Sequence, residues 1–282
     1  MNPAMQAIRS GFRRGRMELR HTFTNGQDVM GYLVPPVILA VVMLFMRGAT
    51  VPGTGFSLSA RTLPGAVGMG IAFVGMAALA GMLVVEREDG TLLRAKAIPH
   101  GMTGYLIGKI VLVSGMTLIG IFLQLAPALL VLDGLTLTGP GAATMVWVFV
   151  LGMMATMPIG AMLGSLFSNP QNMGLIMLPL MGLIGISGIF YPITNFPIWL
   201  QWIAQTFPVY WLGLGTRSAL LPGDMAAVEI GHSWRHLETA AVLGIWAAIG
   251  LVLAPFVLRR MARRESGSAV DARRQKAMQR VR

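Results

Sequence analysis

The sequence predicts an all-α integral membrane protein. Of its 282 residues, 55% are hydrophobic and only 12% are charged, and the mean hydropathy is +0.67. Soluble domains carry about twice that charged fraction, so this composition indicates a protein that lies within a bilayer. Apolar runs without charge, long enough to cross the hydrocarbon core, alternate with charged connectors. The chain has no cysteine, which excludes disulfides, thiolate metal sites and thiol catalysis.

Residues 1–28 predict an amphipathic helix in the lipid headgroup layer on the cytoplasmic side. On a helical wheel, arginines border an apolar stripe, and this pattern is typical of a helix at a membrane surface. The stripe is Met5, Ile8, Phe12, Leu19 and Phe23, and the arginines are Arg9, Arg13, Arg16 and Arg20. A plain basic tail and a mitochondrial transit peptide are the alternatives. A secretory signal is not expected, because no small-residue cleavage site closes the first apolar run.

The charge-free runs divide residues 29–258 into six predicted membrane spans. They lie at about 29–46, 65–85, 105–132, 141–167, 173–190 and 237–258. Pro35 and Pro36 are expected to bend the first span, and Lys109 is expected to reach the surface from the third. A polar turn at Ser168–Asn172 separates spans four and five. Residues 259–282 form a basic tail that is expected to be helical near the membrane and held near anionic lipid.

The distribution of lysine and arginine predicts that both termini are cytoplasmic. With six spans, the inner side holds five of these residues in 1–28, four in 86–109 and nine in 259–282. The outer side keeps only Arg47, Arg61, Arg217 and Arg235. A seventh span through residues 191–225 would place the nine C-terminal charges outside. The net charge of +11 is therefore interpreted as a topology signal, and no nucleic-acid partner is expected.

Residues 191–225 are accordingly predicted to enter the membrane from the outer side and return to it. Pro197 begins one short helix, Pro208 ends it, and a second helix, Val209–Leu221, follows. Non-helical backbone at membrane depth is tolerated only where protein or a watery cavity covers it. This outer hairpin is therefore expected to close the outer end of a pathway.

Residues 86–104 carry too many charges for lipid and are predicted to form a structured loop in water between spans two and three. Asp89–Thr91 provides a turn and a helix start, Leu92–Ile98 provides about two helical turns, and Pro99 ends them. Thr103 is expected to cap the next helix. A short helix that is apolar on one side and charged on the other suggests a docking surface. The alternative is a solvated connector that only fixes topology.

The sequence offers no energy source of its own for transport. Gly104–Lys109 resembles a phosphate-binding loop, but it is one residue short and lacks the following Ser or Thr. All eleven acids lie outside the predicted span interiors, which disfavours an ion-coupled carrier. The four histidines lie in different loops or at opposite faces, so no metal site is predicted. Either another subunit supplies the energy, or the protein does not pump.

Two small-residue motifs have alternative interpretations. Gly185–Gly188 matches the G-x-S-G motif of rhomboid intramembrane proteases, so Ser187 with His236 is a candidate catalytic pair. The competing interpretation is a packing site of small residues, because Gly182 lies on the same helix. Gly160–Gly164 matches the G-x-x-x-G pattern, which in so glycine-rich a chain does not specify an interface.

Two segments resemble the permeases of type-2 ATP-binding-cassette (ABC) exporters, most closely the daunorubicin-resistance type of drug-efflux permease. Glu86–Leu92, followed by Pro99 and Tyr105–Lys109, looks like the loop after span two in that family. The second resemblance lies before the last span, about a hundred residues later. It consists of Ser187–Pro192, Phe196–Leu200, Phe207–Trp211 and Arg217–Leu220. Leu93 and Ala95 depart from the pattern, since relatives often carry further acids there, and His100 follows Pro99.

The resemblance implies a half-transporter that pairs with itself or a similar permease and binds two ATPase subunits, which hold ATP and magnesium. The N-terminal helix would be the connecting helix, with Phe12, Arg13, Arg16, Leu19 and Phe23 at the interface. Residues 89–99 would form a coupling helix, with coupling residues Glu86, Glu88, Gly90, Thr91, Arg94, Lys96 and Pro99. The outer hairpin would gate release, with gate residues Phe190, Tyr191, Pro192, Pro197, Trp199, Phe207, Pro208 and Arg217.

The sequence therefore predicts the permease subunit of an ATP-driven exporter in the cell membrane, without catalytic residues or cofactors of its own. A charge-free, glycine- and methionine-rich pathway favours a small amphipathic or apolar substrate, which would meet the inner faces of spans two and five. The rival hypothesis is a non-transporting assembly or sensor module that uses the same ATPase contact.

Overall fold

The computed structural model describes residues 3–50, 57–167, 173–190 and 192–264, together with residues 267, 268 and 275. Within these residues the regular structure is helical, apart from one isolated bridge between Thr50 and Ser57. Five of the described helical segments are long and apolar enough to cross a membrane, which confirms a multi-pass, all-α membrane protein. They are α2 Gly26–Phe45, α3 Leu58–Phe73 continuing through a π-helical turn Val74–Ala78 into α4 Leu79–Glu88, α6 Gly101–Val131, α7 Gly139–Leu166 and α11 His236–Arg264.

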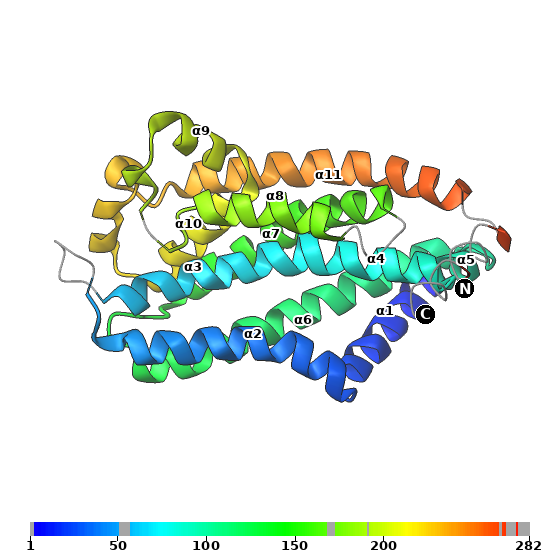
Figure 1. Cartoon of the computed structure of the whole chain (residues 1–282), viewed down its shortest axis with the longest axis horizontal. Helices are drawn as coiled ribbons and strands as arrows, with labels where there is room; N and C mark the ends of the chain where they lie inside the picture. Colours follow the sequence, from blue (N-terminus) through cyan, green and yellow to red (C-terminus); the bar gives the residue numbers. More distant parts are fainter. Residues whose placement is uncertain are drawn as a thin grey trace.

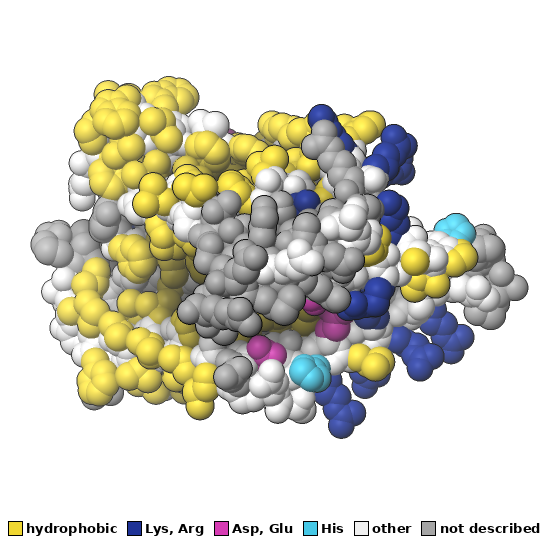
Figure 2. Space-filling model, turned by 45° about the vertical axis from the view of Figure 1, so that its right-hand side comes forward, with side chains coloured by type: hydrophobic (Ala, Val, Ile, Leu, Met, Phe, Trp, Pro, Cys, Tyr) yellow, Lys and Arg dark blue, Asp and Glu magenta, His cyan; other side chains and the backbone are white. Residues whose placement is uncertain are grey.

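The shorter helices lie at the two ends of this bundle and along its side. They are α1 Pro3–Thr22, α5 Thr91–Lys96, α8 Met173–Ile186, α9 Ile198–Thr206 and α10 Pro208–Leu220. The long helices run along the molecule, with α5 and the start of α1 at one end and α9 and α10 at the other (Figure 1). Short 3-10 turns occur at Met46–Gly48, Ile193–Asn195, Gly223–Val228 and Ile230–His232. The lysine and arginine side chains gather toward the α5 end in the view of Figure 2.

Helix α7 is the centre of the packing and contacts α11, α10 and the α3–α4 segment. Small residues let the backbones approach closely there. A Cβ added to Gly160 would lie 2.3 Å from the carbonyl oxygen of Gly75, and one on Gly164 would lie 2.7 Å from that of Ala80. The π-helical turn places Gly75 directly against Thr156. The G-x-x-x-G pattern at Gly160–Gly164 therefore is a helix interface, because only glycine fits between these backbones.

Helix α1 packs along the first half of α6 through a second set of small residues. Gly11 and Gly15 of α1 meet the backbone of Gly104 and Gly108 of α6, and a Cβ on Gly15 would lie 2.5 Å from the Gly108 carbonyl oxygen. Ala7 is buried one turn earlier in the same row. A row of small residues at every fourth position thus fixes α1 to the first half of α6.

Two helix starts differ from the sequence predictions. The helix of span two begins at Leu58 rather than at 65, because Ser57 caps it through a hydrogen bond from the Ala60 amide to its hydroxyl, 3.3 Å long. Helix α6 begins at Gly101, following His100 in the left-handed region, so Thr103 lies inside the helix and the prediction that it is a cap is wrong. The polar turn predicted at Ser168–Asn172 lies outside the described residues.

The predicted span five is shorter in the structure than in the sequence analysis. Helix α8 ends at Ile186, because Gly188 takes a positive φ of 70° and the Ser187 hydroxyl donates to the Ile184 carbonyl. Its 14 residues rise about 21 Å, less than the roughly 30 Å of the hydrocarbon core. The last four residues of the predicted span 173–190 are therefore not helical.

Candidate functional site

The short helix α5 has one buried and one exposed face. Leu92 and Ala95 are buried against the bundle, whereas Arg94 and Lys96 are exposed. The helix start is as predicted. Gly90 has a φ of 78°, which favours glycine, and the Asp89 carboxylate accepts a 2.7 Å hydrogen bond from the Thr91 amide. The short helix predicted within residues 86–104 thus has the expected apolar and charged sides.

Both flanks of α5 are tied to long helices. On one side Arg87 is buried and donates from Nη1 to the carbonyl oxygens of Ser165 and Phe167, each at 2.9 Å, at the C-terminal end of α7. A guanidinium suits this place, because the last carbonyls of a helix lack partners and carry partial negative charge. On the other side Gly101 lies so close to the Ala95 carbonyl that an added Cβ would be 2.1 Å away. The chain on both sides of α5 is therefore held firmly against α6 and α7.

Lys109 lies in a buried charged cluster that joins α1, α4 and α6. It is only 4% exposed and pairs with Glu18, at 2.8 Å, and with Glu86, whose carboxylate also accepts a hydrogen bond from Tyr105. Arg14 holds the other oxygen of Glu18 at 2.7 Å. The expectation that Lys109 reaches the membrane surface is wrong, because two carboxylates compensate its burial.

This inner charged cluster also changes the position expected for Glu86. Its side chain points to Lys109 and Tyr105, away from the exposed face of α5 that carries Arg94 and Lys96. Glu88 is half-buried on α4, and Pro99 is exposed after α5.

Burial raises the pKa of Glu18, but the hydrogen bonds and charges of Lys109 and Arg14 outweigh that effect and lower the pKa overall.

The predicted interfacial residues divide between two faces of α1. Phe12, Arg13 and Arg16 are exposed, whereas Leu19 packs against the core and the Phe23 ring meets Tyr32 edge-on at 6.1 Å. The apolar stripe predicted for one membrane-facing side therefore turns inward at its C-terminal end.

The outer hairpin consists of α9 and α10. As predicted, Pro197 precedes α9 and Pro208 follows it, as the first residue of α10. Almost every residue of α10 is buried, where the helix packs between α3, α7 and α11. The apolar face of α9 points outward, so Trp199 is exposed, while its polar face turns to the protein. On this side, Arg235 Nη1 donates a 2.7 Å hydrogen bond to the side-chain oxygen Oε1 of Gln205. The indole of Trp211 donates to the backbone carbonyl of Gln205.

The remaining predicted gate residues lie around this hairpin without forming one cluster. Phe207 stacks on Trp246 of α11 with ring centroids 5.9 Å apart, Phe190 is partly exposed after α8, and Pro192 precedes a 3-10 turn. Tyr191 lies outside the described residues. Of the predicted set, Arg217 is the most buried, and it has a partner that the sequence analysis did not identify.

Two arginines and one glutamate form a buried outer triad. Arg61 of α3, Arg217 of α10 and Glu229 are at most 3% exposed, and the two arginines hold the one carboxylate at 3.4 Å and 2.9 Å. Arg217 also donates to the Gly188 carbonyl at 3.4 Å. The triad joins span two, the hairpin and the turn after α8. No sequence signal pairs these residues, because 168 positions separate Arg61 from Glu229.

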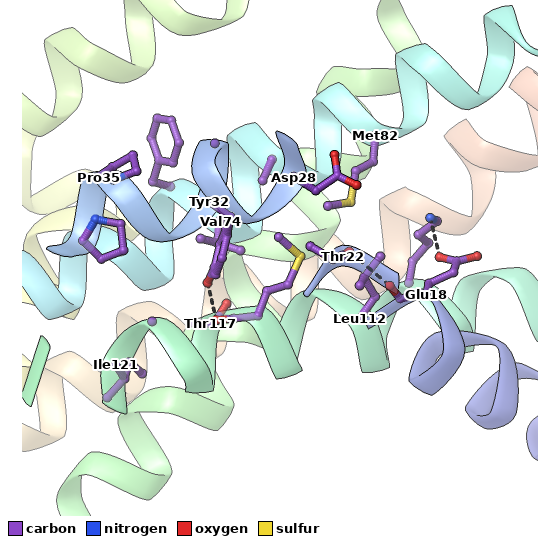
Figure 3. Close-up of a pocket in the computed structure, with 18 of the residues that line it drawn as sticks. Glu18, Thr22, Asp28, Tyr32, Pro35, Val74, Met82, Leu112, Thr117 and Ile121 are labelled. Carbon is purple, nitrogen blue, oxygen red and sulfur yellow. Dashed lines mark hydrogen bonds and ion pairs between the residues drawn. The ribbon is translucent and has the colours of Figure 1, made fainter. Parts of the chain in front are cut away.

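A cavity of about 810 Å³ lies between α1, α2, the α3–α4 segment and α6. Glu18 and Asp28 lie toward one end of it, and Pro35 and Ile121 lie toward the other (Figure 3). Its middle is apolar, and the Tyr32 hydroxyl crosses it to donate to the Met116 carbonyl. We expected substrate contacts on spans two and five, whereas this cavity lies on spans one, two and three.

The candidate protease pair has other partners. The Ser187 hydroxyl is buried and donates to the Ile184 carbonyl at 2.6 Å, and the His236 ring lies edge-on against Trp147 with centroids 6.4 Å apart. Both contacts favour the packing interpretation of the Gly185–Gly188 motif.

The bundle of membrane-crossing helices, with the short helix α5 at one end and the hairpin of α9 and α10 at the other, is that of a multi-pass membrane protein. A family model described as ABC-2 family transporter protein matches residues 50–258, and the chain belongs to this family. A search of curated proteins finds no match. Family membership makes the chain a permease component of an ABC transporter, a component that lacks the ATPase domain and associates with an ABC ATPase subunit.

Proposed function

We propose that this chain is the permease subunit of an ATP-driven exporter and that α5 is its coupling helix. The observation that carries the proposal is the geometry of α5. Arg94 and Lys96 project from a short helix whose buried face rests on the bundle, and Arg87 and Gly101 fix its flanks to α7 and α6. Exposed cations on a rigidly held helix suit a groove that carries carboxylates on the ATPase.

The proposed topology has six spans and cytoplasmic termini in the cell membrane. Apolar α8 is the additional span, completed by the turn residues 187–190, and it is the least regular of the six. The positive-inside rule and the gathering of cations toward the α5 end support this orientation. Pairing of two such chains with two ATPase subunits, which carry ATP and magnesium, and the export of a drug or antibiotic of the daunorubicin type follow from the family resemblance.

In this mechanism the ATPase subunits change their distance when they bind ATP, and each docked α5 tilts with them. The tilt requires contacts that differ between the two nucleotide states, and the exposed face of α5 supplies them. The α3–α4 helix runs from α5 to Arg61 in the outer triad, so it connects the coupling helix with the outer hairpin. An amphipathic or apolar substrate would then be released on the outer side.

Co-purification with the candidate ATPase from the same genome tests this function. Arg94→Glu/Lys96→Glu is expected to release the ATPase or abolish its stimulation by the permease. The matched control is Arg259→Glu/Arg260→Glu, which makes the same charge change at exposed positions at the end of α11. Equal retention of the ATPase by both variants would refute the coupling role of α5.

The rival function is a membrane assembly or sensor module that binds an ATPase without transport. The two functions differ in their response to substrate. An exporter shows ATP hydrolysis that rises with a transported compound, and vesicles that contain the complex accumulate this compound. An assembly module binds the ATPase but shows neither effect.

A further inference from the structure

We propose that the cavity between α2, α3 and α6 binds an elongated amphipathic cation, with its charged group beside Asp28 and its apolar body between the helices. The proposal deepens the proposed function by assigning a substrate class and a place for it within a single chain. The proposal rests on the proposed function only where it identifies the ligand as the transported substrate. Binding itself can be measured without an ATPase.

The shape of the cavity indicates an elongated ligand. Along α6 its lining extends from Lys109 to Gln124, fifteen residue steps that rise about 22 Å. Its volume of about 810 Å³ is in the range of sites for drug-sized molecules. Between the two ends the walls are mainly apolar, with Val67, Phe73 and Met116 from the two long helices. An apolar body of considerable length therefore fits.

The charges at the inner end indicate a cation. Five ionised side chains line this end, three acidic and two basic, and the two basic ones, Arg14 and Lys109, are held by Glu18 and Glu86. Asp28 is the carboxylate left over. Of the ion pairs among the described residues, none includes Asp28, whose contact is a hydrogen bond from Asn25 at 3.0 Å. A ligand cation there would meet an uncompensated carboxylate.

A buried acceptor in the apolar part supports a ligand independently. The Oε1 atom of Gln124 is buried, lines the cavity and has no hydrogen-bond partner among the described residues, while its Nε2 atom donates to the Gly120 carbonyl. An unpaired buried acceptor costs about 1–3 kcal/mol. A donor on a bound molecule would remove that cost.

Helix α2 forms the wall through which such a ligand can enter from the bilayer. Most of α2 is exposed, and it packs on its neighbours far less than the other long helices. Pro35 and Pro36 line the cavity and cannot donate to the carbonyls of Gly31 and Tyr32, so the helix is weakest beside the cavity. Bending there opens the cavity to lipid.

Binding of three matched fluorescent probes to the purified full chain in nanodiscs tests the proposal. The probes share a dansyl-undecyl chain and end in trimethylammonium, hydroxyl or carboxylate. We expect the trimethylammonium probe to bind about tenfold more tightly than the hydroxyl probe, equivalent to one favourable charge contact. Asp28→Asn is expected to remove that advantage and to leave the hydroxyl probe unaffected, whereas Asp224→Asn, an exposed site on the outer side, changes neither.

Filling the cavity locates the site. At Gly70 an added Cβ would meet only Gln124 Nε2, at 3.9 Å, so Gly70→Leu extends into the cavity without a backbone clash. We expect it to weaken all three probes about tenfold or more, while Gly182→Leu, with nothing within 4 Å, leaves binding unchanged. Unchanged thermal unfolding of both variants shows that folding is intact.

Each outcome decides one point. Equal binding of the three probes would overturn the cation class and leave a cavity that takes lipid tails. Binding that is insensitive to Gly70→Leu would overturn the site itself. If the probes bind as expected but no ATPase is stimulated, the exporter function fails while the binding site stands. If an ATPase is stimulated but the probes do not bind, the binding site fails while the exporter function stands.

Discussion

Arg217 of the outer hairpin and Glu229, which follows it in the chain, form a buried ion pair with 2.9 Å between Arg217 Nε and Glu229 Oε1 and side chains 1% and 2% exposed. Arg217 Nη2 donates to the other carboxylate oxygen at 3.3 Å. Arg61 approaches the same carboxylate from α3, so one negative charge holds two positive ones in place. The triad fixes the hairpin to span two, and its removal leaves two arginines facing each other.

Replacing the glutamate should destabilise the fold strongly. Glu229→Gln leaves two buried guanidinium groups without a carboxylate, and breaking a buried pair from one side costs about 3–5 kcal/mol. The midpoint of thermal unfolding in detergent measures the loss. Glu238→Gln, which removes an exposed carboxylate that pairs with Arg235, is the control and should change stability by less than about 1 kcal/mol. Equal midpoints for the two variants would contradict the buried triad.

Substitution of a glycine in the α1–α6 contact should release α1 from the bundle. Gly15→Leu places a side chain where even a Cβ would lie 2.5 Å from the Gly108 carbonyl oxygen and 2.7 Å from Val111. Overpacking of this kind costs about 1–3 kcal/mol. Hydrogen exchange of the α1 amides should accelerate. Gly26→Leu, at a position with open space, should leave exchange within α1 unchanged, and a similar effect of both variants would argue against close packing.

Acid should weaken the same contact through Glu18. Because the folded pKa of Glu18 lies below its ordinary value of about 4.5, its contribution to stability is complete above that value. The contribution is lost as the pH falls through the lower, folded pKa. The protection factors of the α1 amides, which compare their exchange with that of unprotected amides at the same pH, should therefore fall below about pH 4.5, and this pH dependence should decrease in Glu18→Gln. An unchanged pH profile in the variant would exclude Glu18 as the titrating group.

Features that depend on local sequence were predicted well. The membrane class follows from the apolar runs, the start of α5 follows from Asp89 and Gly90, and the bounds of α9 and α10 follow from two prolines. Each of these signals acts within a few residues, where turn and capping chemistry decides the structure.

Features that depend on distant residues were not predictable. From the sequence, Arg61 and Arg217 were expected to be outer charges and Lys109 a surface cation. Their shared partner Glu229 lies 168 positions from Arg61 and 12 from Arg217. Glu18 lies 91 positions from Lys109. The cavity also has no local signal, since it arises from the loose packing of α2 against two other helices. A small-residue row at positions 7, 11 and 15 is the one unused clue to the α1–α6 contact.

The cap of the proposed coupling helix should matter for ATPase stimulation. Asp89→Ala removes the acceptor of the Thr91 amide, and loss of such a cap costs about 0.5–2 kcal/mol. In a helix of only six residues this is enough to disorder the docking face. ATP hydrolysis by the complex should fall several-fold, while Asp89→Asn, which can still accept the hydrogen bond, should retain most of it. Equal ATP hydrolysis by the Asp89→Ala and Asp89→Asn complexes would show that coupling does not depend on this cap of α5.

The inner charged cluster should show strong coupling between Lys109 and Glu86. Lys109→Met leaves the carboxylates of Glu18 and Glu86 partly buried without their shared cation, whereas Glu86→Gln leaves Lys109 with Glu18 alone. In the double variant Lys109→Met/Glu86→Gln the loss of the cation is offset by the loss of one anion. We therefore expect it to be more stable than the sum of the single effects predicts, by about 1–3 kcal/mol. Unfolding in increasing denaturing detergent measures all four members of the cycle, and additive effects would show that the two side chains act independently. Because Glu86 belongs to α4 and Lys109 to α6, the helices on either side of α5, a strong coupling energy would also show that the two flanks of the proposed coupling helix are energetically coupled.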